Sequence, residues 1–132
     1  MTRIIILIIA LFSLLIASCS SKIAYKGINV KNWKVVKENK SFKATFDDFS
    51  GDTYQNIELE AVTKTNFKVQ SNLVKGSIIV YLVDQNKKTI WSSKELKNNI
   101  EEIVTTHNDV IKNYQLFVKG KDASGKFVIT WN

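Results

Sequence analysis

The sequence predicts an all-β fold, an antiparallel β-sandwich of jelly-roll-like type with about 7–8 strands, behind a cleaved signal peptide. Apolar residues in the range 33–131 mostly alternate with polar ones, as successive side chains of a strand do. Clusters of Gly, Asn, Asp and Ser separate the alternating segments, which is typical of turns. No strand–helix–strand alternation is present, so a parallel sheet is not expected.

The first half of the domain contains several short alternating segments. They comprise residues 33–36, 42–46, 57–61 and 67–69. In the segment 57–61, Glu58 and Glu60 separate three apolar residues, which indicates a strand buried on one side only. Between the second and third segments, residues 47–52 have the composition of a turn.

The run Gly76–Val83 predicts a central strand covered on both faces, because it is continuously apolar and rich in β-branched residues. Asp84–Lys87 is expected to turn it into a returning strand over 89–91. A last hairpin is predicted from residues 114–118 and 126–131, with a turn over Gly120–Gly125.

Residues 96–110 are ambiguous between a helix and a strand. Ile100, Ile103 and Val104 have the spacing of a short helix, whereas the stretch 103–106 favours a strand. The strand is the preferred interpretation.

Aromatic residues occupy many of the alternating positions, and they are expected to fill the core rather than to form a platform for stacking sugars. They are Trp33, Phe42, Phe46, Phe67, Trp91, Phe117, Phe127 and Trp131. A binding face would require some of them to be exposed beside a cleft.

The N-terminus has the features of a secretory signal. Arg3 precedes an apolar segment, residues 4–17, that falls short of the roughly 20 residues of a transmembrane helix. The sequence Ile16-Ala17-Ser18-Cys19 that ends it resembles the lipobox of bacterial lipoproteins. The resemblance implies cleavage between Ser18 and Cys19, a diacylglyceryl group on the Cys19 sulfur, and a location on the extracytoplasmic face of the cell membrane. An uncleaved signal anchor is the alternative.

These features divide the chain into a signal peptide over 1–18, a lipidated cysteine with a basic spacer over 19–32, and a β-sandwich domain over 33–132. Removal of 18 of the 132 residues leaves 114, the length of a single domain. The only cysteine is the lipid attachment site, so the domain is expected to fold without a disulfide.

Positive charge is concentrated near the predicted anchor. The net charge is +7, and residues 22–43 contain seven lysines against the single acid Glu38. Lys22, Lys26 and Lys31 are therefore expected to contact anionic lipid or an anionic wall polymer; a solvated spacer with one charged strand face is the alternative. Nucleic acid is not an expected partner, because the mature chain is exported and lacks arginine.

Catalytic constellations are not found in the sequence. The chain has one histidine, His107, in a polar stretch typical of an exposed turn, and it has no zinc-binding spacing, nucleophile elbow or Gly-rich phosphate loop. No catalytic residue and no cofactor are predicted. Asp47, Asp48 and Asp52 are a weak candidate for Ca²⁺ ligands, against the alternative of an ordinary Asp-rich turn.

Glycines and packing aromatics recur in a recognisable order. The patterns are Phe46-x-x-Phe49-x-Gly51, Lys75-Gly76-Ser77-Ile78, Tyr114-x-Leu116-x-Val118-x-Gly120 and Gly125-Lys126-Phe127-x-Ile129-x-Trp131. Together, over residues 42–131, they resemble small secreted β-sandwich modules of low-GC Gram-positive bacteria, which occur as lipoproteins. Such residues specify a fold and not a chemistry, so the resemblance implies no catalytic residue.

The favoured function is a membrane-anchored, non-enzymatic binding or accessory module whose ligand or protein partner the sequence does not identify. A lipoprotein conferring immunity to a bacteriocin is one alternative. The octapeptide 11–18 is also similar to peptides that Gram-positive cocci release from lipoprotein signals as mating pheromones, so a pheromone precursor is another. An enzyme is disfavoured, because no group of convergent titratable residues is evident.

Overall fold

The computed structural model describes residues 27–60, 64–107 and 112–132. Their regular structure consists of six strands: β1 (Ile28–Glu38), β2 (Ser41–Leu59), β3 (Thr65–Val83), β4 (Thr89–Ser92), β5 (Ile100–Thr106) and β6 (Lys112–Trp131). In this part of the chain, no helix has the length and hydrophobicity needed to span a membrane. The lipobox, including Ser18 and Cys19, the octapeptide 11–18, and Lys22 and Lys26 all lie outside the described residues.

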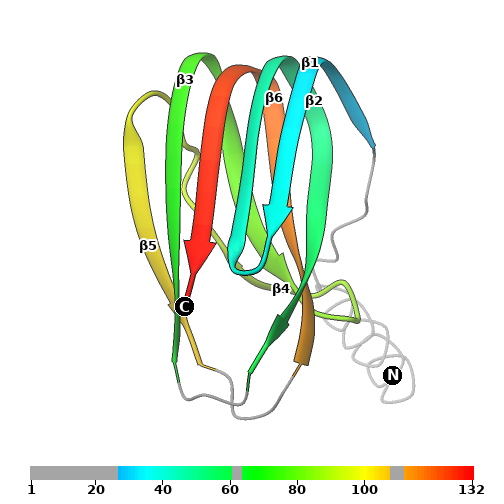
Figure 1. Cartoon of the computed structure of the whole chain (residues 1–132), viewed down its shortest axis with the longest axis vertical. Coiled ribbons are helices and arrows are strands. Elements are labelled where there is room, and N and C mark those ends of the chain that lie inside the picture. The colour runs from blue at the N-terminus through cyan, green and yellow to red at the C-terminus, as the bar shows by residue number, and fades with distance from the viewer. Residues whose placement is uncertain (1–26, 61–63, 108–111) are drawn as a thin grey trace, which may run out of the picture.

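All strand pairs are antiparallel. The hydrogen-bonded order is β1-β2-β6-β3-β4, and β5 pairs with β3 as well. The long strands β2, β3 and β6 have 19, 19 and 20 residues, several times the usual strand length of about 5–6 residues. Figure 1 shows these strands curving over at one end of the molecule and returning, so that each runs through two layers.

The pairing registers divide the sheet into those two layers. The first layer contains β1, residues 41–46 of β2, residues 125–131 of β6, residues 65–73 of β3, and β5. The second contains residues 52–59 of β2, 112–120 of β6, 77–83 of β3, and β4. The predicted antiparallel sandwich is thereby confirmed, and it is built from one sheet folded onto itself.

Each long strand crosses between the layers through an irregular bend. The register of β2 shifts between Phe46 and Gly51, and that of β3 shifts between Leu73 and Ser77. Several residues at the bends have a positive φ, which turns a strand sharply at a bulge. They are Asp48, Gly51, Gly76, Asp122 and Gly125.

The core lies between the layers and is dominated by aromatic rings. Phe46 lies 5.1 Å from Phe49, 5.8 Å from Phe127 and 5.8 Å from Trp33, measured between ring centroids. Phe42 packs edge-on against Phe127 at 5.1 Å. The expectation that aromatics fill the core is confirmed for the predicted residues except Phe117, which is buried on the outer face of the second layer and lies outside the core cluster.

The predicted turns over residues 47–52 and 120–125 are wrong. Both segments are bends inside continuous strands, because pairing between β2 and β6 resumes beyond each of them. Pairs of predicted strands therefore merge into single long strands, and the described residues form six strands where about seven or eight were expected. β1 also begins at Ile28, within the range predicted as a spacer.

Other predictions hold. The chain turns at Asp84–Lys87, where the Lys87 amide donates to the Asp84 carbonyl at 3.1 Å, and β4 returns along β3. The ambiguous region contains a strand, β5. The run Gly76–Val83 lies inside the sheet between β6 and β4 as expected, but only its inner face is fully covered, because Ile79 and Tyr81 on the outer face are half-buried.

Candidate functional site

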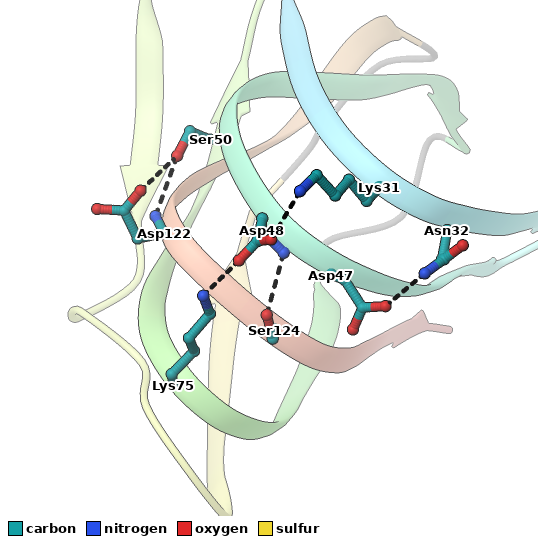
Figure 2. A network of polar contacts seen from close by, with 8 residues as sticks. All are labelled: Lys31, Asn32, Asp47, Asp48, Ser50, Lys75, Asp122 and Ser124. Atoms are coloured by element: carbon teal, nitrogen blue, oxygen red, sulfur yellow. Dashed lines mark hydrogen bonds and ion pairs between the residues drawn. The ribbon is translucent and has the colours of Figure 1, made fainter.

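The three aspartates considered as weak candidates for Ca²⁺ ligands have different partners in the structure. At the bend of β2, Asp48 binds Lys75 and also pairs with Lys31 at 3.7 Å, as Figure 2 shows. Asp47 accepts a hydrogen bond of 2.7 Å from the Asn32 amide. Asp52 lies beyond the bend, 6% exposed in the second layer.

The contacts of Asp47 and Asp48 join the bend of β2 to β1 and β3. In the described part of the chain, no group of three or more His, Cys, Asp or Glu side chains is placed to hold a metal ion. Lysine ammonium groups lie against the carboxylate of Asp48. The hydrogen bond and charge of Lys75, followed by the charge of Lys31, hold the pKa of Asp48 below its usual value of 3.8.

We expect Asp48→Asn to reduce the loss of stability at acid pH. Because the pKa of Asp48 is lowered by folding, its contribution is present above about pH 3.8 and is lost as the pH falls through the folded value. Asparagine tolerates the positive φ of 49° and removes only the charge. Thermal unfolding of the full chain between pH 7 and 2 measures the slope. Lys75→Gln should flatten it in part, because Lys31 still lowers the pKa of Asp48, and a slope unchanged in both variants would contradict the assignment.

Two further predicted residues are placed by the structure. Lys31 pairs with Asp48 at 3.7 Å at the bend, and its side chain is 76% exposed. His107 follows the end of β5 and is exposed, as predicted.

The tryptophans do not form an exposed platform. Trp33 covers Phe46 and Phe49 at the edge of the core, and Trp91 packs edge-on against Phe67 at 5.3 Å. Trp131 lines a cleft of about 520 Å³ at the open end of the sandwich, but it is only 9% exposed. The condition that exposed tryptophans beside a cleft would favour ligand binding is therefore not met by these three rings.

A different aromatic row lies on the outer face of the second layer. In the pairing register, Tyr54 of β2 and Tyr81 of β3 both lie opposite Phe117 of β6, so the three residues cross the sheet side by side. The Tyr54 ring stacks on Phe117 with centroids 5.2 Å apart and an interplanar angle of 28°. Phe117 is 1% exposed, whereas both tyrosines are half-buried and reach solvent. We call these three residues the aromatic row.

Beside it lies a polar row of three residues, one outward position further along β2 and β6 and in the turn that follows β3. They are Asn56, Gln115 and Lys87. The Gln115 amide donates to Asn56 at 3.3 Å, and the Lys87 ammonium donates to Gln115. The same ammonium lies 5.9 Å from the Phe117 ring centroid, a cation–π distance. Hollows of about 460 and 220 Å³ border the two rows, and Asn56 lines both. The face therefore offers flat rings next to amide and ammonium groups.

Tyr81 keeps its proton over the ordinary pH range. Burial, followed by the nearby charge of Asp52, raises the pKa of the Tyr81 hydroxyl above its usual value of 10.0. The hydroxyl is therefore a hydrogen-bond donor at neutral pH.

Sequence reasoning missed Tyr54 and Tyr81, although one signal for Tyr81 was present. Its run is apolar on both faces, which predicts a strand covered on both sides, but the aromatic residue sits on the face opposite Ile78, Val80 and Leu82. A tyrosine at such a position also suits a face left partly open, because its ring is apolar and its hydroxyl reaches water. For Tyr54, no comparable pattern exists, since it lies between the predicted turn over 47–52 and the predicted strand over 57–61, in residues assigned to neither.

Comparisons with known proteins find no matching family model and no matching curated protein. Among solved structures, a CBM4 module has a TM-score of 0.49 at 12% identity, covering 78% of this chain and 73% of its own. CBM86, a low-affinity xylan-binding module of Roseburia intestinalis, has 0.44 at 12%, covering 84% and 90%. TmCBM61 in complex with β-1,4-galactotriose has 0.44 at 14%, covering 80% and 86%. The similarity is one of strand arrangement, at identities that indicate nothing about a ligand.

Proposed function

We propose that the mature protein is a lipid-anchored extracytoplasmic binding module for carbohydrate, with Cys19 as the anchor and the aromatic row as the binding platform. The observation that carries the choice of ligand is the aromatic row beside the polar row on an open sheet face. The anchor is supported by the lipobox pattern, in which the chain's only cysteine follows Ala17-Ser18.

The chemistry of the face suits a sugar ring. A pyranose has an apolar face of C–H groups that packs on a flat aromatic ring, and its hydroxyls both donate and accept hydrogen bonds. Tyr54 and Tyr81 supply half-buried rings whose positions are fixed by packing around Phe117. Asn56 and Gln115 supply amides that donate and accept, and Lys87 supplies donors.

The spacing suits more than one sugar residue. The row crosses three adjacent strands, which places Tyr54 and Tyr81 two strand separations apart, about 10 Å. That distance matches a short oligosaccharide lying across the strands better than a single monosaccharide. A polymer is therefore the expected ligand class.

We expect Tyr54→Ala and Tyr81→Ala each to weaken polysaccharide binding up to about ten-fold, since a stacked ring contributes roughly 0.5–1.5 kcal/mol and about 1.4 kcal/mol corresponds to a factor of ten. The measurement is retardation of the lipidated chain, solubilised in detergent, in native gels containing soluble xylan, β-1,4-galactan or bacterial wall glycan. Tyr54→Phe keeps the ring and should retain most of the affinity. Ile103→Ala is the matched control, because Ile103 is 64% exposed on the outer face of the other layer.

Two outcomes are decisive. If no polysaccharide retards the wild-type chain, or if Ile103→Ala weakens binding as much as the tyrosine variants do, the carbohydrate assignment fails. The anchor is tested separately by mass spectrometry of the membrane-extracted protein, where the wild type should begin at a diacylglyceryl-modified Cys19 and Cys19→Ala should carry no lipid.

A further inference from the structure

Three lysines gather on the outer face of the first layer, opposite to the aromatic row. Lys34 of β1 and Lys126 of β6 both lie opposite Thr45 of β2 in the pairing register. Lys43 occupies the next outward position of β2, about 7 Å along the strand. Lys34 and Lys126 are two strand separations, about 10 Å, apart. We call Lys34, Lys43 and Lys126 the basic triad.

The basic triad has no partner among the residues that the structure describes. All three side chains are exposed, and none makes a hydrogen bond or an ion pair there. By contrast, Lys31 and Lys75 share Asp48, and Lys68 pairs with Glu101 at 3.4 Å. Three like charges so close together repel one another, and a surface that brings counter-charges relieves this repulsion.

The face around the triad contains little negative charge. Its acids are Glu38 at the hairpin end of β1, Asp47 at the bend end of β2 and Glu101 on β5. Asp47 accepts a hydrogen bond of 2.7 Å from the Asn32 amide, and Glu101 is engaged by Lys68 and by the Gln70 amide at 2.9 Å. Val36, 46% exposed, lies opposite Lys43. A hollow of about 340 Å³ opens next to Lys126, and its lining includes Gln70, Glu101 and Ile100. The surface is thus basic, with an apolar side chain and a polar recess beside the charges.

The chain length ties this face to the anchor. Seven residues separate Cys19 from Gly27, so the Cα atoms of these two residues lie at most about 28 Å apart when the chain is extended. The first strand after them, β1, carries Lys34 on this face. A domain held so close to a membrane turns one of its surfaces towards the headgroups. The most basic surface is favoured, because the attraction between lysines and anionic headgroups acts within a Debye length of about 8–10 Å.

We propose that the outer face of the first layer lies against anionic headgroups of the membrane, through the basic triad. The proposal rests on the anchor at Cys19 in the proposed function. It differs from the expectation for Lys22, Lys26 and Lys31, because it requires Lys126, which is distant in sequence, and not Lys31, which pairs with Asp48. In this orientation the aromatic row on the opposite layer points away from the membrane.

The test is amine labelling of the full lipidated chain on vesicles, read lysine by lysine by mass spectrometry. The vesicles contain phosphatidylcholine alone or mixed with phosphatidylglycerol. On the anionic vesicles, labelling of the triad should fall about five-fold relative to phosphatidylcholine at about 0.1 M salt, and the difference should vanish near 1 M salt. Labelling of Lys119, exposed on the second layer, should not change.

Lys43→Glu should remove the protection of Lys34 and Lys126, whereas the matched Lys119→Glu should leave it intact. Equal labelling on both vesicles would overturn the proposal, and so would protection that appears only when anionic wall polymer is added. The anchor is tested independently by measuring whether the chain stays bound to phosphatidylcholine vesicles near 1 M salt. A chain without lipid would dissociate from these vesicles but could still be bound and protected by phosphatidylglycerol vesicles. Failure of the anchor is therefore distinguishable from failure of the proposed membrane-facing surface.

Discussion

Gly125→Ala is expected to remove a large part of the stability of the domain. Gly125 has a φ of 137°, a conformation that is strained for any residue with a Cβ. A Cβ added there would lie 2.2 Å from the Asn72 carbonyl oxygen and 2.7 Å from the Leu73 Cα. Both neighbours are backbone atoms of β3 at the bend, so they cannot rotate away. Strain and overpacking together should cost about 4 kcal/mol or more, against a typical total of about 5–15 kcal/mol.

Denaturant unfolding of the full chain, followed by tryptophan fluorescence, measures this loss. The matched control is Gly27→Ala, because Gly27 also has a positive φ, 88°, but nothing lies within 4 Å of its added Cβ. The control therefore reports the cost of φ without the clash. Equal losses in the two variants would show that the close approach of β6 to β3 is not what requires glycine at position 125.

Phe46→Ala is expected to have the second largest effect. Phe46 is 1% exposed, and its ring lies among those of Trp33, Phe49 and Phe127. Truncation leaves a cavity that the three neighbouring rings cannot fill, so we expect the free energy of unfolding to fall by about 3–5 kcal/mol. The melting temperature should fall on the order of 20 °C, measured by near-ultraviolet circular dichroism.

Phe46→Leu should lose clearly less than Phe46→Ala, since it refills part of the cavity. Val74→Ala serves as the control, because Val74 is 84% exposed at the bend and should change stability by no more than about 0.5 kcal/mol. A melting temperature of Phe46→Ala close to that of Val74→Ala would mean that the aromatic cluster is not the centre of the core.

The local strand pattern was predictable, but its continuation through the bends was not. Phe42, Ala44 and Phe46 alternate and are buried as the period requires. At Asp48 and Gly51, however, a hairpin turn and a bulged bend use the same residue types, because both need a positive φ. Which of the two forms depends on the pairing of β2 with β6, and that partner is distant in sequence.

The candidate site likewise depends on pairing between strands that are distant in the sequence. Tyr54, Tyr81 and Phe117 are far apart in the sequence, and no local pattern relates them. They meet because β6 lies between β2 and β3, with a register that sets both tyrosines opposite one phenylalanine. The anchor motif is different in kind, since it is a contiguous signal that is recognisable from the sequence alone.

The continuity of the long strands has a mechanical consequence. β2 carries Lys43 in one layer and Tyr54 in the other, and β6 likewise carries Lys126 and Phe117. A load applied to one face while the opposite face is held therefore passes along covalent backbone through the bends, and not across the apolar contact between layers. Such a sandwich resists being sheared into its two halves, because no separation of the layers is possible without straightening β2, β3 and β6 (Figure 1).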